Sequence, residues 1–474
     1  MKRVLLINPP EMGQGVSSTP TNGMLYLAAY LRKYGFDPPF ADGWLIGWDG
    51  VEQRIIDYKP DIIGLTSITG GRHKAVKVAE IAKRIDPKIL VVLGGVHPTI
   101  MWKQMLEHYP VIDIIVRGEG EITLLEIAQG KALSEIDGIC YRHNDRVIRN
   151  KDRELIADLD DIPFPAWDLH DLRAFSAPNN ARPGEIIKGI DASREPVAPM
   201  IFSRGCPGRC NFCSTWWIWK CYRRRTAKNL VDEVELLHNK YNIKSFKFVD
   251  DCFTDDKEAI MEFCDEVERR KLNIIFTTLT RGDRVDEEML ERLQRAGNYL
   301  ISFGVESGSQ KILDIMRKEI DLKKVEENIM ICKKVGLRVN ELLIVGNIGE
   351  TIDTVNDTVE FVKRTQPDVT SVSNGMMIFP GTQLYQHSKR VGLIDEDFWV
   401  KTEHVYAMYT HGYPKWMLDV FTHAVINHRR LPRSKFMVAM RNHRYFTRSI
   451  KDRIRRSLGT EKHKKRIKGY YPNL

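Results

Sequence analysis

One short stretch decides the fold class of this chain: Ser203-Arg-Gly-Cys-Pro-Gly-Arg-Cys-Asn-Phe-Cys-Ser214. It contains three cysteines, Cys206, Cys210 and Cys213, in the spacing C-x3-C-x2-C. Thiolates this close can converge on one small centre, and iron–sulfur clusters are the usual occupants of such soft-ligand loops. Most cubane clusters use four cysteines. Because this loop supplies three, it predicts an enzyme in which one iron stays open to a small molecule.

A structural zinc site is the alternative that this loop allows. Such a site needs a second ligand pair at matching spacing, whereas the other cysteines stand singly at positions 140, 221, 252, 264 and 332. Unevenly spaced cysteines in a long chain are typical of a reducing cytoplasm, where thiols remain free for metal. We therefore favour a cluster over zinc and expect a cytoplasmic location.

The cysteine triplet follows a short apolar strand, and in this arrangement it resembles the radical S-adenosylmethionine superfamily. The resemblance implies a 4Fe–4S cluster bound by Cys206, Cys210 and Cys213. It also implies that S-adenosylmethionine chelates the open iron and is cleaved reductively to a 5′-deoxyadenosyl radical. An electron donor such as flavodoxin or ferredoxin would supply the reductant.

Length and composition indicate two or three domains, because 474 residues with 43% hydrophobic content can form large cores. The sequence has no apolar run of 18 or more residues that would predict a membrane-spanning helix. Its start turns polar after a run of four apolar residues, 4–7, and is interpreted as a first β-strand rather than a signal peptide.

Positive charge is concentrated at the C-terminus, where residues 441–474 contain twelve Lys or Arg residues and two acidic ones. The sequence leaves several roles open for this basic tail. It could be solvated, or it could contact a membrane surface or an acidic partner, which would make the protein membrane-associated. Binding to nucleic acid is not expected.

Residues 1–135 alternate strand-like and helix-like segments, which predicts an α/β domain with a doubly wound, Rossmann-like parallel sheet. The expected strands are 3–8, 61–66, 88–93 and 112–117, and the expected helices are 23–34, 72–85 and 120–129. Glycines and small polar residues follow these strands, so a large ligand could approach the backbone there. No G-x-G-x-x-G follows the first strand, which disfavours a dinucleotide.

The position of this domain ahead of the cysteine loop resembles the cobalamin-binding domain of cobalamin-dependent radical enzymes. The resemblance implies cobalamin contacts from Ser67, Thr69, Gly94, Gly95, His97, Gly118 and Glu119. Many cobalamin domains have a cobalt-ligating histidine in Asp-x-His-x-x-Gly. Here the nearest string, 168–173, ends in Arg and lies in a linker, so we expect no histidine of this sheet to ligate cobalt. His97 could instead cap the following helix.

A hairpin and a linker are expected over residues 136–198, followed by a second α/β domain over 199–400. Its predicted strands lie near 200–204, 243–249, 273–278, 299–304, 338–345 and 369–376. Six strand–helix units match the partial (βα)6 TIM-type barrel that the superfamily resemblance implies, with reactive groups at the carboxyl ends of the strands. Residues 401–474 are expected to form a helical extension that ends in the basic tail.

Several residues at these predicted strand ends are candidates for binding or catalysis. By resemblance, S-adenosylmethionine would be contacted by Glu306, Ser307, Gly346, Gly349 and Glu350. A carboxylate such as Glu306 can accept hydrogen bonds from ribose hydroxyls or an ammonium group, whereas Ser307 could equally cap a helix. Asp250 and Asp251 end the second barrel strand and could hold a cation or a proton, or could cap the next helix.

The finer resemblance is to the anaerobic magnesium-protoporphyrin IX monomethyl ester oxidative cyclases and their relatives. It rests on Met101-Trp-Lys-Gln104, on Trp216-Trp-Ile-Trp-Lys-Cys-Tyr-Arg223 and on Gly469-Tyr470. It implies that a large, apolar small-molecule substrate is functionalised at an unactivated C–H bond. The alternative within the family is a cobalamin-dependent C-methyltransferase acting on a tetrapyrrole, a lipid or another natural product.

Two further classes fit the sequence less well. A tRNA-modifying radical enzyme would suit the basic tail, but residues 400–474 contain no alternating strands and no extra cysteine. A sensor that only binds cobalamin would leave the cysteine triplet and Glu306 without a role. We therefore expect an enzyme that uses a cluster, S-adenosylmethionine and cobalamin.

Overall fold

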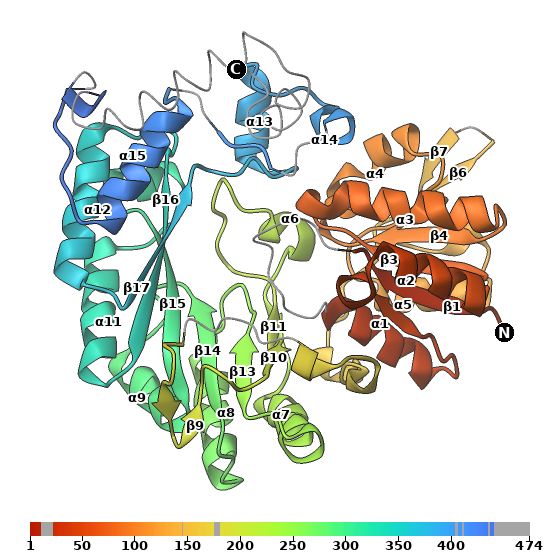
Figure 1. Cartoon of the computed structure of the whole chain (residues 1–474), viewed down its shortest axis with the longest axis horizontal. Helices are drawn as coiled ribbons and strands as arrows, with labels where there is room; N and C mark the ends of the chain where they lie inside the picture. Colours follow the sequence, from red (N-terminus) through yellow and green to blue (C-terminus); the bar gives the residue numbers. More distant parts are fainter. Residues whose placement is uncertain are drawn as a thin grey trace.

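The computed structural model describes residues 1–10, 22–144, 146–174, 181–402, 406–409, 412–434 and 437–439. It contains two α/β units that lie side by side, with C-terminal helices near the upper end of the second unit in Figure 1. The predicted fold class, a doubly wound sheet followed by a partial barrel, is confirmed.

The N-terminal unit is built on a seven-stranded sheet in the order β2-β1-β3-β4-β5-β6-β7. Its strands are β1 (Val4–Asn8), β2 (Phe40–Asp42), β3 (Ile62–Thr66), β4 (Leu90–Gly94), β5 (Ile114–Val116), β6 (Ile139–His143) and β7 (Arg146–Arg149). The first five strands pair in parallel, whereas β6 and β7 form an antiparallel hairpin at the edge next to β5. The hairpin that we expected in the linker segment thus extends this sheet.

Helices cover both faces of this sheet. They are α1 (Asn22–Lys33), α2 (Gly43–Tyr58), α3 (Arg72–Ile85), α4 (Val96–His108) and α5 (Glu121–Gln129). Side chains of β1 alternate between the two faces, as a strand requires. Leu6 packs into the core that includes α1 and α5, whereas Leu5 and Ile7 pack into the core that includes α2 and α3.

Residues 197–374 form a six-stranded sheet in the order β10-β13-β14-β15-β16-β17. Its strands are β10 (Val197–Met200), β13 (Ser245–Phe248), β14 (Ile275–Thr280), β15 (Asn298–Glu306), β16 (Arg338–Val345) and β17 (Val369–Asn374). All neighbours pair in parallel, and in the described residues β10 and β17 do not pair with each other. The barrel is therefore open, as the predicted partial barrel requires.

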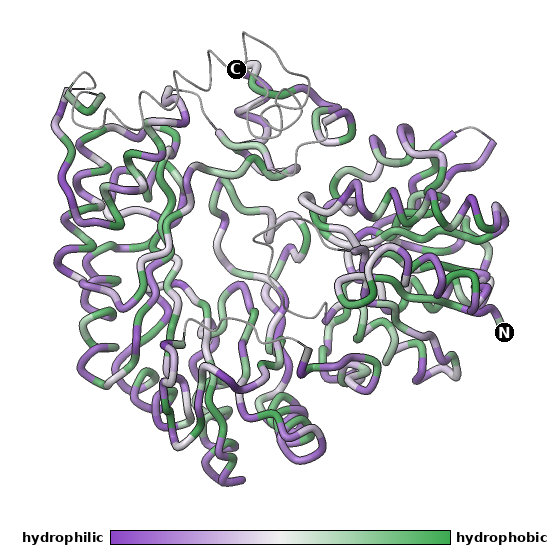
Figure 2. The backbone as a smooth tube through the Cα atoms, in the orientation of Figure 1, coloured by the Kyte–Doolittle hydropathy of each residue, from purple (hydrophilic) through white to green (hydrophobic). Residues whose placement is uncertain are grey.

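The helices of this unit pack against the outer face of the barrel. They are α7 (Ala227–Tyr241), α8 (Lys257–Arg269), α9 (Glu287–Ala296), α10 (Gln310–Ile315), α11 (Leu322–Lys334) and α12 (Ile352–Thr365). Hydrophilic and hydrophobic residues alternate along them in Figure 2, which is the pattern of amphipathic helices with one buried face. Phe248, Phe263 and Phe276 pack edge to face between this helical layer and the strands.

Smaller elements complete the described chain. The short strands β8 (Ile186–Ile187) and β9 (Ile190–Asp191) lie at the amino-terminal end of the barrel, where Ile190 packs against Tyr299. Short 3₁₀ turns η1 to η5 occur at Thr69–Gly71, Leu133–Glu135, Leu159–Asp161, Trp167–Leu169 and Leu172–Ala174. The strands β8 and β9 therefore cover the amino-terminal end of the barrel.

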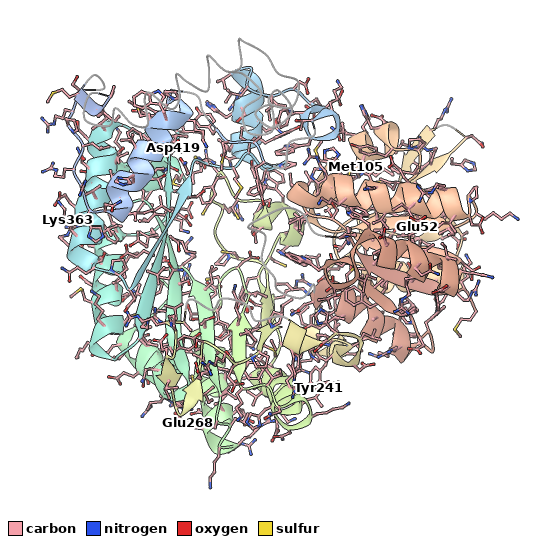
Figure 3. All side chains as sticks on the ribbon, viewed as in Figure 1. Glu52, Met105, Tyr241, Glu268, Lys363 and Asp419 are labelled. Atoms are coloured by element: carbon pink, nitrogen blue, oxygen red, sulfur yellow. The ribbon has the colours of Figure 1, made fainter. Side chains whose placement is uncertain are left out.

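The C-terminal region contributes α13 (Gln383–Arg390), α14 (Phe398–Lys401) and α15 (Lys415–Ile426). Helix α15 packs on β17 and α12. Asp419, labelled in Figure 3, projects from α15 and accepts a hydrogen bond from Asn374 Nδ2 at 2.5 Å. The predicted basic tail at 441–474 lies outside the described residues. Among the residues described, no helix is both long and apolar enough to cross a membrane.

One acidic side chain, Glu341, lies in the apolar layer between β16 and the outer helices. It is fully buried, and neither of its carboxyl oxygens has a hydrogen-bond partner among the described residues. The nearby Thr365 hydroxyl donates to Phe361 O instead. Burial raises the pKa of Glu341 from 4.5 to about 7. The folded protein therefore holds this carboxyl protonated in a range where the unfolded chain ionises it.

We expect Glu341→Gln to change how stability depends on pH. Because the pKa of Glu341 is raised in the folded protein, the protonated carboxyl makes its full contribution to the free energy of unfolding below pH 4.5. This contribution is lost as pH rises through about 7. At pH 8 the variant should be more stable than the parent by on the order of 2 kcal/mol, with little difference at pH 4.5. Denaturation midpoints at the two pH values measure this. The exposed Glu262→Gln on α8 is the control, and an equal effect from both variants would contradict the assignment.

Candidate cluster and cofactor site

The cysteine loop lies at the carboxyl end of β10, between β11 (Ser203–Arg204) and α6 (Thr215–Trp219). Its three cysteines are partly exposed and form no disulfide. A Cβ atom placed on Gly208 would lie 3.5 Å from Cys206 Sγ and 3.8 Å from Cys210 Sγ. Since two of the thiols flank one glycine, the loop presents both sulfurs to the same small region.

The surroundings of these thiols suit an anionic thiolate-bound cluster. Arg281 Nη1 lies 2.9 Å from the same Cβ position on Gly208. Burial raises the pKa of the Cys210 thiol, while Lys318 and Arg281 act in the opposite direction because they favour the thiolate. Within the described chain, no three His, Cys, Asp or Glu side chains are already gathered around a point that would hold a single ion. Three soft donors along one loop fit a polynuclear cluster, in which each sulfur can bind a different iron.

Glu306 ends β15 close to this loop in a strained conformation. Its φ is +66°, which is uncommon for a residue other than glycine and is found preferentially at functional sites. Lys318 Nζ donates to Glu306 Oε1 at 3.0 Å, and Lys318 is buried beside Cys210. The structure thus brings a carboxylate and an ammonium group to the open side of the cysteine loop. These are the complementary groups for the charged amino and carboxylate ends of an amino acid.

The other predicted S-adenosylmethionine contacts mostly support turns. Ser307 is fully buried, and its hydroxyl lies 3.3 Å from Thr358 Oγ1 on α12. The buried Glu350 carboxylate accepts hydrogen bonds from Gly346 N at 2.8 Å and from Asn347 N at 3.1 Å. Burial raises the pKa of Glu350 to about 7. Glu350 therefore holds its own turn together. Gly346 and Gly349 adopt positive φ values of 82° and 77° in that turn, so their predicted contact with adenine would involve the backbone.

Asp250 and Asp251 have different surroundings although they are neighbours. Asp250 is buried and accepts hydrogen bonds from Phe202 N at 3.1 Å and from Ser203 Oγ at 2.6 Å. Burial raises the pKa of Asp250 to about 6. It anchors the backbone that leads into the cysteine loop. Asp251 is exposed and accepts from Thr215 Oγ1 at 3.1 Å. Of the two predicted catalytic carboxylates, Asp251 is the accessible one.

A cavity of about 280 Å³ lies between the N-terminal sheet and the barrel. On the sheet side it is lined by the glycine turns after β4 and β5, including the predicted Gly94, Gly95, Gly118 and Glu119. Gly95 has a φ of +102°, and a Cβ atom there would lie 2.6 Å from Ser67 O. Only glycine fits this turn, so the backbone can approach a large ligand closely.

The barrel side of the cavity is formed by residues around the cysteine loop, among them Arg204, Trp219, Asp250 and Asp251. Arg204 and the lining residues of α1, such as Tyr26, were not predicted as site residues from the sequence. Of the other loop tryptophans, Trp217 is exposed, and Trp216 lies under the Arg209 guanidinium at 4.1 Å from its ring centre. The cavity therefore lies between the predicted cobalamin turns and residues that flank the predicted cluster loop, whereas residues 205–214 of that loop are not among its lining residues.

Three predicted cobalamin residues do not line this cavity: Ser67, Thr69 and His97. His97 is fully buried in the first turn of α4, and its Nδ1 lies 3.2 Å from Thr69 Oγ1. It makes no cap, because the helix starts at Gly95 without a side-chain cap. Burial lowers the pKa of His97 well below its ordinary value, with Arg72 nearby acting in the same direction. His97 is therefore a neutral, enclosed histidine.

We expect bound cobalamin to lack a protein imidazole on cobalt, because no histidine is among the described residues that line the cavity. The measurement is the electron paramagnetic resonance spectrum of cob(II)alamin in protein containing ¹⁵N-labelled histidine. The spectrum should be identical with labelled and unlabelled protein. A nitrogen splitting that changes with the label and disappears in His97→Ala would contradict this expectation.

An ion-pair network joins the N-terminal unit to the cysteine loop. Arg204 Nη1 donates to Glu119 Oε1 at 2.6 Å, and Arg204 Nη2 donates to Glu121 Oε1 at 2.6 Å. The Arg204 guanidinium also lies 5.7 Å from the ring centres of Tyr26 and Trp219. Arg204 is nearly enclosed and stands two residues before Cys206, so these contacts fix the loop against the cobalamin turns. The carboxylate of Glu119, a predicted cobalamin contact, is thus already paired within this network.

Comparison with known protein families matches both units. Residues 200–362 match the model of the Radical SAM superfamily, and residues 14–128 match that of the B12 binding domain. Among solved structures, the chain is similar to the radical S-adenosylmethionine methyltransferase TsrM from Kitasatospora setae with cobalamin and a 4Fe–4S cluster bound. The TM-score is 0.68 at 19% identity, over 83% of this chain and 76% of that one. This likeness concerns the fold.

Two curated proteins share more sequence with the chain. It is 34% identical over 384 residues to the anaerobic magnesium-protoporphyrin IX monomethyl ester cyclase of Rubrivivax gelatinosus, which covers 77% of this chain and 66% of that protein. It is 30% identical over 397 residues to an uncharacterised methyltransferase of Pyrococcus horikoshii, over 81% of this chain and 83% of that protein. The chain thus spans slightly less than two thirds of the cyclase.

Proposed function

Because this chain belongs to the radical S-adenosylmethionine superfamily and carries a B12-binding domain, we propose that it functionalises an unactivated C–H bond of a large, apolar substrate. It is an enzyme whose cofactors are a 4Fe–4S cluster, S-adenosylmethionine and cobalamin. We propose oxidative chemistry like that of the tetrapyrrole cyclases as the main reaction, since a cyclase is among its most similar relatives.

The observation that supports this proposal is a cavity lined on one side by the predicted cobalamin turns and on the other by residues that flank the cysteine loop. Arg204 and Trp219 line the cavity, and they lie within a few residues of Cys206 and Cys213. When bound, the cluster supplies the electron for cleaving S-adenosylmethionine to a carbon radical, and cobalamin supplies a second reactive centre for the substrate. A substrate carbon between the two sites would be within reach of both.

The chain's own residues would orient the two cofactors and exclude water. Cys206, Cys210 and Cys213 would ligate three irons, and the Glu306–Lys318 pair would hold the charged end of S-adenosylmethionine. Asp251, exposed on the cavity wall, would be placed to accept a proton from the substrate. An apolar substrate suits the aromatic lining that Trp219 provides.

A C-methyltransferase is the second candidate, and a specific observation favours it. The methyltransferase relative from Pyrococcus horikoshii matches over 83% of its length, more than the cyclase does. The chain also resembles cytidylyl-2-hydroxyethylphosphonate methyltransferase of Streptomyces wedmorensis at 26% identity over 461 residues. A tRNA-modifying activity has no comparable support in the described residues.

The reaction type can be tested with S-adenosylmethionine labelled in its methyl group. The anaerobically reconstituted enzyme would be incubated with this substrate, cobalamin, a reductant such as flavodoxin or ferredoxin, and either magnesium-protoporphyrin IX monomethyl ester or a cell extract. We expect 5′-deoxyadenosine and an oxidised product without label. A labelled product would replace the cyclase proposal by the methyltransferase, and absence of 5′-deoxyadenosine would overturn both. The Cys213→Ala variant gives the background for each product.

A further inference from the structure

The alternation of side chains along each strand shows which residues face the interior of the barrel. Phe246 and Phe248 of β13 are buried in the core against the outer helices. Lys247 between them must therefore point to the barrel interior, because successive side chains of a strand face opposite sides. By the same rule, Thr277 of β14 faces inward, since Phe276 packs outward. Lys247 and Thr277 are register partners on adjacent strands.

Lys247 differs from the other charged residues on this inner face because it has no partner. Arg338, at the amino-terminal end of β16, pairs with Glu185 at 2.7 Å. Glu306, at the carboxyl end of β15, pairs with Lys318 at 3.0 Å. No hydrogen bond or ion pair connects the Lys247 ammonium to any described residue, and no acidic group acts on it. Burial alone lowers the pKa of this lysine, yet the side chain remains partly accessible.

The opposite wall of the barrel offers polar groups that are already arranged. Asn340 Nδ2 donates to Ser302 Oγ at 3.2 Å, and Ser371 Oγ donates to Asn340 Oδ1 at 2.9 Å. This row runs across β15, β16 and β17, on strands whose outward side chains, such as Ile301 and Val339, are in the core. By strand register Lys247, Thr277, Leu300 and Arg338 form one row, and the Ser302–Asn340 pair lies one inward-facing row nearer the carboxyl ends of the strands. Among the described residues of this inner face, Lys247 is the cation without a partner.

Closer to the cysteine loop the inward side chains of β16 become apolar. Leu342 and Ile344 continue β16 toward its carboxyl end on the same side as Asn340. Val249, two residues beyond Lys247, is 42% exposed and lines the cavity between the two units. A molecule that extends from the cavity along β13 would meet Val249 first, and Lys247 lies two residues deeper on the same strand.

We propose that Lys247 binds an anionic group, a carboxylate or a phosphate, at the inner end of an otherwise apolar substrate. The substrate class is thus an amphipathic acid whose apolar part lies toward the two cofactors. This inference rests on the proposed function and specifies its substrate. It accounts for an unpaired cation in a place where a structural lysine would ordinarily have a carboxylate partner.

Chemical protection of Lys247 tests this proposal without catalysis. The reconstituted protein, with cluster and cobalamin, would be acetylated briefly, and modification of each lysine would be measured by mass spectrometry. The probes are octanoate, octyl phosphate and octanol. We expect octanoate or octyl phosphate to slow acetylation of Lys247 by about tenfold, as a charge-assisted hydrogen bond allows, and octanol to have no effect. Lys228, exposed on α7, is the internal control and should react equally in all samples.

Each outcome decides the proposal. Protection by octanoate alone identifies a carboxylate site, and protection by octyl phosphate alone identifies a phosphate site. Equal protection by octanol, or no protection by any probe, would overturn the inference.

Lys247→Met should weaken octanoate binding in equilibrium dialysis by about tenfold, whereas Lys244→Met, just before β13, should not. If Lys247→Met fails to retain the cluster, the labelling of the parent protein decides alone. Since labelling needs no turnover, its result is independent of the labelled-methyl experiment.

Discussion

Replacement of Cys206, Cys210 or Cys213 with Ala is expected to abolish formation of 5′-deoxyadenosine. The three thiols lie on one loop, and two of them lie within 3.8 Å of the position that a Cβ atom on Gly208 would take. Losing one leaves a second iron of the cubane without its protein ligand, so the cluster should be lost or unable to present a single open iron. The measurements are iron and sulfide content, the charge-transfer absorption of the cluster, and 5′-deoxyadenosine yield after anaerobic reconstitution.

Cys221→Ala provides a matched control for this experiment. Cys221 is exposed and follows α6, eight residues after Cys213. It should keep full cluster content and full cleavage of S-adenosylmethionine. Continued 5′-deoxyadenosine formation in any of the three loop variants, or loss of the cluster in Cys221→Ala, would contradict the ligand assignment.

Arg204→Met is expected to uncouple cobalamin from the cluster loop. It leaves the buried Glu121 without its guanidinium partner at 2.6 Å, whereas Glu119, which also loses Arg204, keeps Arg223 Nη1 at 3.1 Å. Removing one member of a buried ion pair costs about 3–5 kcal/mol, because the remaining charges stay desolvated. If about 1.4 kcal/mol of this cost falls on cobalamin binding, affinity drops by about tenfold. Optical titration with cobalamin measures the effect.

The companion variants show whether this effect belongs to the network. Arg209→Met changes an arginine of the same loop that lies over Trp216 instead, and it should bind cobalamin like the parent. In Arg204→Met/Glu121→Gln one uncompensated charge is removed, so part of the lost affinity should return. Unchanged cobalamin affinity in Arg204→Met would show that these ion pairs do not position the cobalamin turns.

The sequence predicts the framework of the site because its signals are local. The cysteine spacing, the six apolar strands of the barrel and the glycine turns of the first domain can each be recognised within about a dozen residues. In the structure the glycine turns and the residues that flank the cysteine loop line one cavity at the carboxyl ends of their strands. The short strand β2 and the helix α2 escaped prediction because β2 has only three residues and α2 is interrupted at Gly47, which has a φ of +65°.

Roles that depend on distant partners could not be predicted. Asp250 looks like a catalytic carboxylate in the sequence, but it binds the backbone of Phe202 and Ser203, about 48 residues away. Glu350 differs from Asp250 because its partners are local: it accepts from Gly346 N, four residues away, within its own turn. Arg204 belongs to no recognisable motif in the sequence. Its role in fixing the cysteine loop depends on ion pairs with Glu119 and Glu121 of the other unit. Only the packing of the two units reveals these pairs.

The most direct test of the central claim is the Mössbauer spectrum of ⁵⁷Fe-reconstituted protein with and without S-adenosylmethionine. We expect a cubane in which one of four irons shifts on addition of S-adenosylmethionine and the other three do not. A cubane whose four irons are equivalent and unaffected by S-adenosylmethionine would contradict it, as would a protein that retains zinc instead of iron.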